Sequence, residues 1–335
     1  MVDATHMSFA ASDRSYFSLI KKEIHKRSIE IGINPKRVAE IDLIVAELTT
    51  NLFKYAIEGE ILFGSFKEGQ NAYIEIISID KGPGIANPAR MLQDGVSSTK
   101  SMGHGLGSIK RLSDTFDIYS LPDWGTILLS RVYVTTPVKP GSRIVIRPIV
   151  LSKAGETVSG DGLAIKTGKD YVKIMLCDGL GHGPEANKAI NEAEKAFRIF
   201  PDTDPTDTLR FIHNAIKKTR GMVSNIVCFD LKSKTWSSAG IGNISARWLG
   251  PVSFKNHMSY NGIVGHNIPN TMNAQSYPAD LYNQVILASD GIKTRWDTAK
   301  YPMIQKCDPS VLAAAIYKDH ARHTDDMSVV VIKFK

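Results

Sequence analysis

The sequence predicts an α/β (α+β) protein with two domains. Its 335 residues exceed the usual size of a single hydrophobic core. Segments with helical periodicity and segments with strand patterns occur in both halves, which is typical of mixed folds. A stretch that contains two prolines and a glycine, at 135–142, separates the halves. We therefore expect a first domain at 8–136, a linker at 137–143 and a second domain at 144–335.

The composition is that of a globular protein without a membrane-spanning segment. Hydrophobic residues make up 43% of the chain and charged residues 22%. The net charge of +7 is small for this length and comes without a block of Lys and Arg, so we expect neither nucleic-acid binding nor membrane insertion. No apolar run reaches the roughly 18 residues of a transmembrane helix. We interpret residues 1–6 as a vector-derived leader before a natural start at Met7.

The cysteines indicate a reducing compartment. There are three of them, an odd number, and Cys177 and Cys228 lie within apolar runs. This pattern favours buried thiols over a disulfide framework, and we expect the protein to be cytoplasmic.

Two helices are predicted at the start of the first domain. Residues 15–31 carry apolar side chains at helical spacing, and Gly32 and Pro35 end that pattern. A second helix is expected from Pro35 to about Ala56. Its apolar stripe consists of Ile41, Val45, Leu48 and Leu52.

A polar face of the second helix holds the first candidate site. Glu47, Asn51 and Tyr55 recur at i, i+4 and i+8, so that a carboxylate and a carboxamide lie one turn apart. Such a pair can hold a metal ion and a water. The alternative for an isolated Glu-x-x-x-Asn is a solvated polar face, and the segments that follow decide between the two.

A strand and a glycine turn supply the second candidate site. The strand at 72–79 is followed by Asp80, and Gly82 and Gly84 then permit the close backbone approach that a flat ligand needs. The Asp80 carboxylate can accept a hydrogen bond from an exocyclic amine, which suits adenine. Thr126, in a later strand at 125–133, is expected to cap the floor of this nucleotide site.

A glycine loop supplies the third candidate site. After a polar segment at 87–102, which we interpret as a lid, Gly103, Gly105 and Gly107 open a helical pattern, an arrangement that suits phosphate groups. The glycine spacing is similar to part of a dinucleotide-binding fingerprint. Its position after a long polar segment and an earlier Asp-x-Gly-x-Gly argues against NAD.

These three segments resemble, in order, the N, G1 and G2 boxes of the GHKL ATPase superfamily. Within it, the short domain is similar to the anti-sigma-factor serine/threonine kinases, especially the stressosome switch kinases, although many of the wider kinases carry His where Tyr55 stands. The segments are Glu47-Leu-Thr-Thr-Asn51, Asp80-Lys-Gly-Pro-Gly84 and Gly103-His-Gly-Leu-Gly107, with Asn51-Leu-Phe-Lys-Tyr55-Ala56 for the kinase branch.

The resemblance implies a GHKL α/β sandwich that binds ATP with Mg²⁺. It implies that Asn51 holds Mg²⁺ on the ATP phosphates, that Glu47 orients or deprotonates the substrate hydroxyl, and that Asp80 binds adenine. These roles agree with phosphoryl transfer, which depends on positioning and a metal more than on covalent catalysis.

Aspartates at strand ends recur in the second domain. Strands are expected at 144–150, 163–165, 171–176, 225–230, 235–239 and 245–248, and helices at 184–200 and 206–219. Asp161, Asp178, Asp290 and Asp325 each lie beside an apolar run, although a single such aspartate is most often a turn former. Four together suit Mg²⁺ or Mn²⁺, and no paired His/Cys motif indicates zinc.

The aspartate segments resemble, in family order, those of the SpoIIE-type phosphatases, which belong to the metal-dependent type 2C serine/threonine phosphatases. The resemblance covers roughly residues 145–335. The segments are Gly160-Asp161, Asp178-Gly-Leu-Gly-His-Gly183, Ala239-Gly-Ile-Gly-Asn243, Ser289-Asp290-Gly291 and Thr324-Asp325-Asp326-Met327-Ser328.

The resemblance implies an αββα sandwich that holds two Mn²⁺ or Mg²⁺ ions. Asp178 then bridges the two metals with the Gly179 carbonyl on the first, and Asp290 and Asp325 complete the second. Asp161 acts mainly through water held by a metal.

The two resemblances predict a bacterial signalling protein that joins a kinase-like domain to a phosphoserine/phosphothreonine phosphatase. Partner-switching regulators, such as STAS-domain anti-sigma antagonists or similar phosphoproteins, are the implied substrates. His182 is a candidate proton donor to the leaving serine, with a plain turn residue as the alternative. Because the activities oppose each other, we expect different substrates or nucleotide control across the linker.

Two alternatives remain on the sequence alone. In one, the ATP-binding half is a non-catalytic module that binds partners in a nucleotide-dependent way and regulates the phosphatase. In the other, the chain is a metal-binding scaffold without activity. Homo-oligomerisation is left open.

Overall fold

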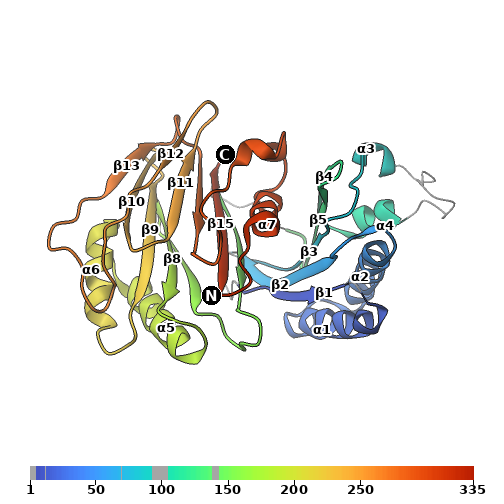
Figure 1. Ribbon diagram of the computed structural model, residues 1–335, viewed down its shortest axis with the longest axis horizontal. Helices are drawn as coiled ribbons and strands as arrows, with labels where there is room; N and C mark the ends of the chain where they lie inside the picture. Colours follow the sequence, from blue (N-terminus) through green and yellow to red (C-terminus); the bar gives the residue numbers. More distant parts are fainter. Residues whose placement is uncertain (1–4, 12, 69, 93–104, 138–142) are drawn as a thin grey trace. The chain divides into compact units, whose positions relative to one another are not determined.

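The computed structural model describes residues 5–335 except 12, 69, 93–104 and 138–142. The chain forms two compact units (Figure 1): unit 1 is Met1–Gly141 with Ala299–Ala315, and unit 2 is Ser142–Thr298 with Ile316–Lys335. The segment Ala299–Ala315, which the sequence placed within the second domain, therefore packs with unit 1. Most of the predicted linker lies outside the described residues.

Unit 1 is an antiparallel sheet with helices on one face, as Figure 1 shows. The strand order is β1-β2-β3-β5-β4. The strands are β1 (Met7–Ala10), β2 (Glu60–Glu68), β3 (Asn71–Ile79), β4 (Thr115–Leu121) and β5 (Gly125–Tyr133), and the helices are α1 (Phe17–Glu30), α2 (Pro35–Tyr55), α3 (Pro88–Met91) and α4 (Gly105–Leu112), with a 3₁₀ turn at Arg14–Tyr16.

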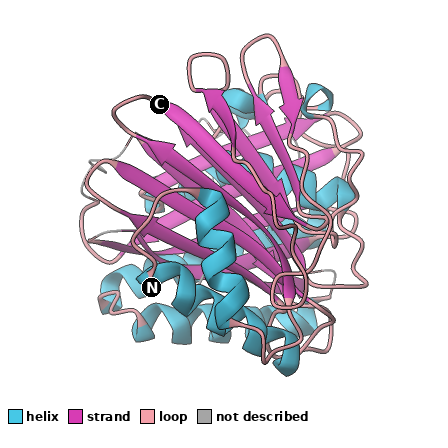
Figure 2. Cartoon of the chain, turned by 90° about the vertical axis from the view of Figure 1, so that its left-hand side faces the viewer, coloured by secondary structure: helices cyan, strands magenta, loops and turns pink. Residues whose placement is uncertain are grey.

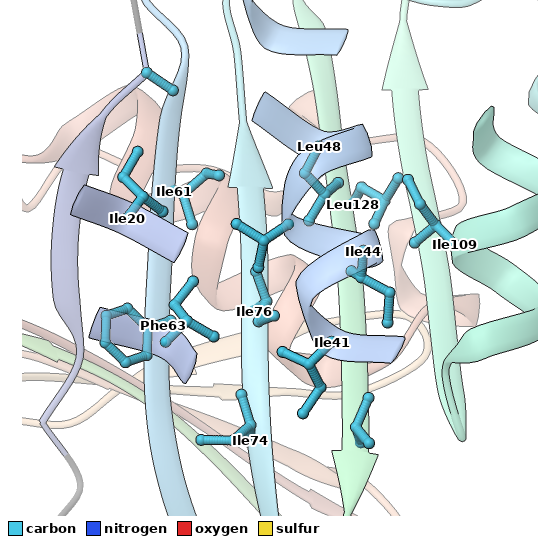
Figure 3. Close-up of a cluster of buried hydrophobic side chains, with 14 of the residues drawn as sticks. Ile20, Ile41, Ile44, Leu48, Ile61, Phe63, Ile74, Ile76, Ile109 and Leu128 are labelled. Carbon is cyan, nitrogen blue, oxygen red and sulfur yellow. The ribbon is translucent and has the colours of Figure 1, made fainter. Parts of the chain in front are cut away.

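Helix α2 is the longest element of unit 1 and forms as the sequence predicts. Asn34 caps it by accepting a hydrogen bond from the Arg37 amide, and Pro35 occupies the first turn. The predicted stripe faces the sheet, where Ile41 and Leu48 lie beside Ile76 and Leu128 (Figure 3). Strands β1 and β2 were not predicted, because β2 is buried on both faces and lacks alternation.

Unit 2 contains two stacked antiparallel sheets with helices outside. One sheet has the order β13-β10-β9-β8-β7 and the other β12-β11-β14-β15-β6. Helices α5 (Pro184–Ile199) and α6 (Pro205–Ala215) pack on the first sheet, and Figure 2 views the strands from the side of unit 2, with a helix lying across them. The α/β fold class with two sandwiches is confirmed.

The remaining elements complete unit 2 and the C-terminal segment. The strands are β6 (Ile144–Leu151), β7 (Asp161–Thr167), β8 (Tyr171–Gly179), β9 (Met222–Asp230), β10 (Thr235–Ile241), β11 (Ser245–Leu249), β12 (Phe254–Asn256), β13 (Gln275–Pro278), β14 (Gln284–Ala288) and β15 (Met327–Phe334). Two 3₁₀ turns at Thr298–Lys300 and Ile304–Lys306 precede helix α7 (Pro309–His320). Helix α7 was not predicted, because its side chains are apolar on all sides rather than on one stripe.

The three cysteines are free, and Cys177 and Cys228 are buried as expected. In the described part of the chain, no helix has the length and apolarity that crossing a bilayer requires. His6, within the segment interpreted as a leader, is buried, and its Nε2 lies 3.3 Å from Glu75 Oε1.

The core of unit 1 can be tested with two neighbouring residues of α2. Ile44 is fully buried, whereas Leu43 is 57% exposed. We expect Ile44→Ala to lower the free energy of unfolding of unit 1 by about 2–5 kcal/mol, because it leaves a cavity under the helix. Leu43→Ala is the control and should change it by less than about 0.5 kcal/mol. Urea unfolding of both variants measures the difference, and equal losses would contradict the assigned helix face.

Candidate nucleotide and metal sites

The candidate nucleotide site of unit 1 begins on α2. Glu47 and Asn51 are half-buried on one side of the helix, next to the stripe that packs on the sheet. A Cβ built on Gly105, the first residue of α4, would lie 2.9 Å from Glu47 Oε2 and 3.9 Å from Asn51 Oδ1. The structure thus brings Glu47, Asn51 and Gly105 together, and a residue with a side chain would not fit this close to Glu47.

Asp80 organises the second part of this site. Its Oδ1 accepts hydrogen bonds from the Gly82 amide at 2.7 Å and from the Thr126 amide at 3.3 Å, and its own amide donates to the Thr126 carbonyl at 3.0 Å. Gly82 also lies against α2, since a Cβ there would be 2.7 Å from the Tyr55 carbonyl oxygen. The end of α2 therefore adjoins the turn that holds Asp80.

Two glycines make this turn sterically possible. Gly84 has φ +74° and Gly125 has φ +115°, and a Cβ on either would come within 2.0 Å of a carbonyl oxygen, that of Leu121 or of Asp80. The sequence did not single out Ser120, whose hydroxyl lies 2.9 Å from Thr126 Oγ1 and accepts from the Ile85 amide at 2.7 Å. No local pattern marks Ser120, because its partners are distant in sequence.

The glycine loop is only partly described. Gly105 begins α4 and Gly107 is buried within it. Gly103 and His104, with the predicted lid from residue 93 onward, lie outside the described residues.

The candidate metal site of unit 2 begins with two facing aspartates. The antiparallel register of β7 and β8 pairs Asp161 with Asp178, so that both side chains project on one face of the sheet. Asp161 is 4% exposed; its Oδ2 accepts from Ser328 Oγ at 2.7 Å. Its Oδ1 is buried and has no hydrogen-bond partner among the described residues. A buried carboxylate oxygen without a donor fits a cation.

The glycine loop after Asp178 is held close to its neighbours. The Gly179 amide donates to the Gly160 carbonyl at 2.9 Å, and a Cβ on Gly179 would lie 2.8 Å from the Ala186 carbonyl oxygen. His182 is exposed, and its Nδ1 lies 2.6 Å from Glu156 Oε1. Glu156 was not predicted, and it gives the candidate proton donor a fixed carboxylate partner.

Asp290 follows β14, and Asp325 lies just before β15. Asn243 Nδ2 donates to Asp290 Oδ2 at 3.0 Å, and Asp325 Oδ1 accepts from the Asp326 amide at 2.9 Å. Asp326 has a structural role, because its two oxygens accept from the Lys153 and Gly160 amides, each at 2.9 Å. It thereby ties the start of β15 to the strand that carries Asp161.

Electrostatic repulsion dominates this cluster. Burial, followed by the charges of Asp161, Asp290, Asp325 and Asp326, raises the pKa of Asp178 from 3.8 to about 9. Burial likewise raises the pKa of Asp161 to about 7, against the hydrogen bonds from Ser328 and Ser289. At neutral pH a proton on Asp178 therefore relieves the repulsion, and a bound cation would take the place of that proton.

The side chains alone do not form a closed ligand set. Among the described residues, no group of three or more His, Cys, Asp and Glu side chains is placed to hold a metal ion by itself. Electrostatic repulsion acts over longer distances than metal coordination does. The aspartates can therefore shift one another's pKa values without lying close enough to share one ion. Mg²⁺ commonly keeps several waters and takes one or two carboxylates, and the open arrangement fits an ion of that kind.

The comparisons with known proteins define the class of unit 1. Residues 12–130 match the histidine kinase-like ATPase domain. The serine/threonine-protein kinase RsbT of Bacillus subtilis (strain 168) is 33% identical over 97 residues, which are 29% of this chain and 73% of RsbT. The chain therefore belongs to the RsbT family of histidine kinase-like ATPases.

Solved structures resemble the rest of the chain. A structure from work on the bacterial stressosome, described as a modular system adapted to control secondary messenger signalling, has a TM-score of 0.52 and 23% identity, and covers 57% of this chain and 99% of that one. RsbX, solved in complex with magnesium, has a TM-score of 0.51 and 17% identity, with 59% and 99% covered. At these identities the likeness shows the fold alone: over more than half of its length, the chain has the fold of RsbX.

The repulsion around Asp178 predicts how stability depends on pH. The folded-state pKa of Asp178 is raised, so the folded protein binds more protons than the unfolded chain between pH 3.8 and about 9. In EDTA, the free energy of unfolding of unit 2 should therefore fall as pH rises through this window. Saturating Mn²⁺ should remove the fall, because a bound cation favours the ionised carboxylates.

Thermal unfolding at several pH values, with EDTA or Mn²⁺, measures this effect. Asp178→Asn removes the titrating group and should flatten the curve in EDTA. A wild-type curve that is as flat as that of the variant would contradict the repulsion.

Proposed function

We propose that this chain is a bacterial partner-switching enzyme with two opposing activities. Unit 1 transfers phosphate from ATP to a serine or threonine of a protein, and unit 2 removes phosphate from phosphoserine or phosphothreonine. The observation that carries the proposal is the facing pair of aspartates, buried Asp161 and half-buried Asp178, in a chain whose other unit belongs to the RsbT kinase family. The protein acts in the cytoplasm on STAS-domain anti-sigma antagonists or similar phosphoproteins.

In the kinase reaction, three residues of unit 1 have separate roles. Asp80 accepts a hydrogen bond from the adenine amino group, Asn51 holds Mg²⁺ through its carboxamide oxygen, and Glu47 accepts the proton of the substrate hydroxyl. When bound, magnesium would neutralise the charge that develops on the ATP phosphates during transfer. Gly82, Gly84, Gly103, Gly105 and Gly107 would give the nucleotide access to the backbone, and Thr126 would close the floor. Support comes from the close approach of Gly105 to Glu47 and Asn51.

In the phosphatase reaction, the aspartates of unit 2 would hold two divalent cations, Mn²⁺ or Mg²⁺. Asp178 would be a ligand of both, with the Gly179 carbonyl on the first and Asp290 and Asp325 on the second, and Asp161 would act through water. When bound, the cations activate a water and neutralise the phosphate charge. His182, held by Glu156, donates a proton to the leaving serine oxygen.

The domains that carry these activities are 8–136 and 144–335, joined by 137–143, with Ala299–Ala315 packed on the first. The alternative, in which the ATP-binding half only binds and regulates, is not favoured. A binding module needs Asn51 and Asp80 but gives Glu47 no reason to lie beside Gly105 at the start of α4. A pull-down of STAS-domain proteins, followed by phosphorylation and dephosphorylation assays, tests the substrate class.

Glu47 can be tested against a matched glutamate on the same helix. Glu47→Gln should lower phosphate transfer to a recovered STAS-domain protein by about 10²–10⁴-fold, because the hydroxyl loses its proton acceptor. The affinity for ATP should stay within about twofold. Glu40→Gln is the control, since Glu40 only pairs with Arg37 at the start of α2. Unchanged phosphate transfer by Glu47→Gln, measured with radiolabelled ATP, would contradict the role of Glu47 as the proton acceptor.

Asp178 can be tested against an aspartate at the end of a neighbouring strand. Asp178→Asn should lower Mn²⁺-dependent hydrolysis of p-nitrophenyl phosphate by about 100-fold or more, because the shared metal ligand is lost. Asp230→Asn is the control: Asp230 is exposed and accepts hydrogen bonds from the Lys232 and Ser233 amides in a turn, both at 2.8 Å. Full activity of Asp178→Asn would exclude the proposed metal site.

A further inference from the structure

Within unit 2, the turn between α6 and β9 lies beside the glycine loop at 179–183, which follows the candidate metal ligand at the end of β8. The antiparallel register of β8 and β9 pairs Gly179 with Met222 at the ends of the two strands. One residue further along, the Leu180 amide donates to the Gly221 carbonyl at 3.1 Å. The residues just before Gly221 are therefore level with the middle of the glycine loop.

Arg220 is the residue that this register places against the loop. A Cβ built on Gly181 would lie 3.2 Å from Arg220 Nη1, so the guanidinium lies next to the loop backbone. The Arg220 side chain is exposed, and within the described part of the chain it forms no ion pair with a carboxylate. Its hydrogen-bond donors are therefore available to a ligand.

The backbone of Arg220 is held firmly although its side chain is free. The Arg220 carbonyl accepts from His266 Nε2 at 2.8 Å. Gly221 has φ +79°, and a Cβ there would lie 2.8 Å from the Val264 carbonyl oxygen, so the turn requires glycine. Met222 and Val264 then exchange backbone hydrogen bonds at 3.0 and 2.8 Å. Little backbone freedom remains to be lost when the guanidinium binds a ligand.

Positive charge surrounds Arg220. Lys217 and Lys218 precede it in the chain, and both are exposed. Burial, followed by the charges of Lys217 and His266, lowers the pKa of His213 near the end of α6, which shows that these groups act on the same region. An exposed cluster of one sign attracts ligands of the opposite sign, so this turn favours an anion beside the glycine loop.

We propose that Arg220 is the residue of unit 2 that binds the phosphate group of the substrate. Its guanidinium donates parallel hydrogen bonds to two oxygens of the phosphate, the geometry in which arginine recognises such groups. Arg220 thereby holds the phosphate over the glycine loop and takes no part in proton transfer. This inference rests on the proposed phosphatase activity of unit 2 and adds the side chain that holds the substrate there.

The test measures binding of radiolabelled inorganic phosphate to the full chain by equilibrium dialysis in saturating Mg²⁺. Arg220→Gln removes the charge and the fork of donors, and should raise the Kd for phosphate about 10- to 100-fold, the effect of losing hydrogen bonds to a charged group. The KM for p-nitrophenyl phosphate should rise in parallel while kcat changes less, because the contact is already made to the bound substrate. Arg220→Lys restores the charge without the fork and should recover part of the affinity.

Arg198→Gln is the matched control. Arg198 also belongs to unit 2, but it lies in the last turn of α5, at the opposite end of that helix from the glycine loop, and pairs with Glu194 at 2.8 Å. This variant should bind phosphate like the wild type.

Mn²⁺ binding, followed by electron paramagnetic resonance of the free ion, separates contact with phosphate from support of the loop. Arg220→Gln should bind Mn²⁺ like the wild type. A loss of Mn²⁺ affinity as large as the loss of phosphate affinity would overturn the inference, because Arg220 would then only maintain the shape of the loop.

The remaining outcomes separate this inference from the proposed function. If the wild type neither hydrolyses p-nitrophenyl phosphate nor binds phosphate, the phosphatase proposal is wrong and the inference is lost with it. If the wild type is active and a folded Arg220→Gln binds phosphate equally well, the inference is overturned and the phosphatase stands. If Arg220→Gln does not fold, Arg220→Lys decides, since it lacks the fork: a Kd for phosphate equal to that of the wild type would overturn the inference.

Discussion

The pairing of Asp161 with Asp178 across β7 and β8 is the constraint on which unit 2 depends. Two carboxylates that face each other in a buried place repel, and Asp290 and Asp325 add to the repulsion at Asp178. The surroundings relieve it only in part, through Ser328 on Asp161 and Asn243 on Asp290. Without a cation, Asp178 relieves the repulsion by keeping its proton, as its raised pKa indicates. A cation that replaced this proton would therefore change the stability of unit 2.

In unit 1, glycines at a strand end and at the start of a helix allow close contacts between the backbone and polar residues. Asp80 must approach the backbone of β5 closely, which is why a Cβ on Gly125 would collide with its carbonyl oxygen. Gly105 lies as closely against Glu47. Because a side chain does not fit at these points, glycine is what lets the backbone of β5 and of α4 come this close to the polar groups of Asp80 and Glu47.

The sequence predicted the features that neighbouring residues determine and missed those that depend on contacts between residues far apart in the chain. Helix α2, its buried stripe and the Asp80 turn follow from spacing and from glycine conformations, both of which neighbouring residues determine. Glu156 and the hydrogen bonds of Ser120 to Ile85 and of Ser328 to Asp161 were missed, because each of these pairs lies at least 26 residues apart in the chain and no periodic pattern marks it. Strand β2 and helix α7 were missed because an element buried on all sides has no polar face to reveal its period. The candidate site residues were chosen from local patterns alone: aspartates at strand ends beside glycine, and polar side chains one turn apart on α2.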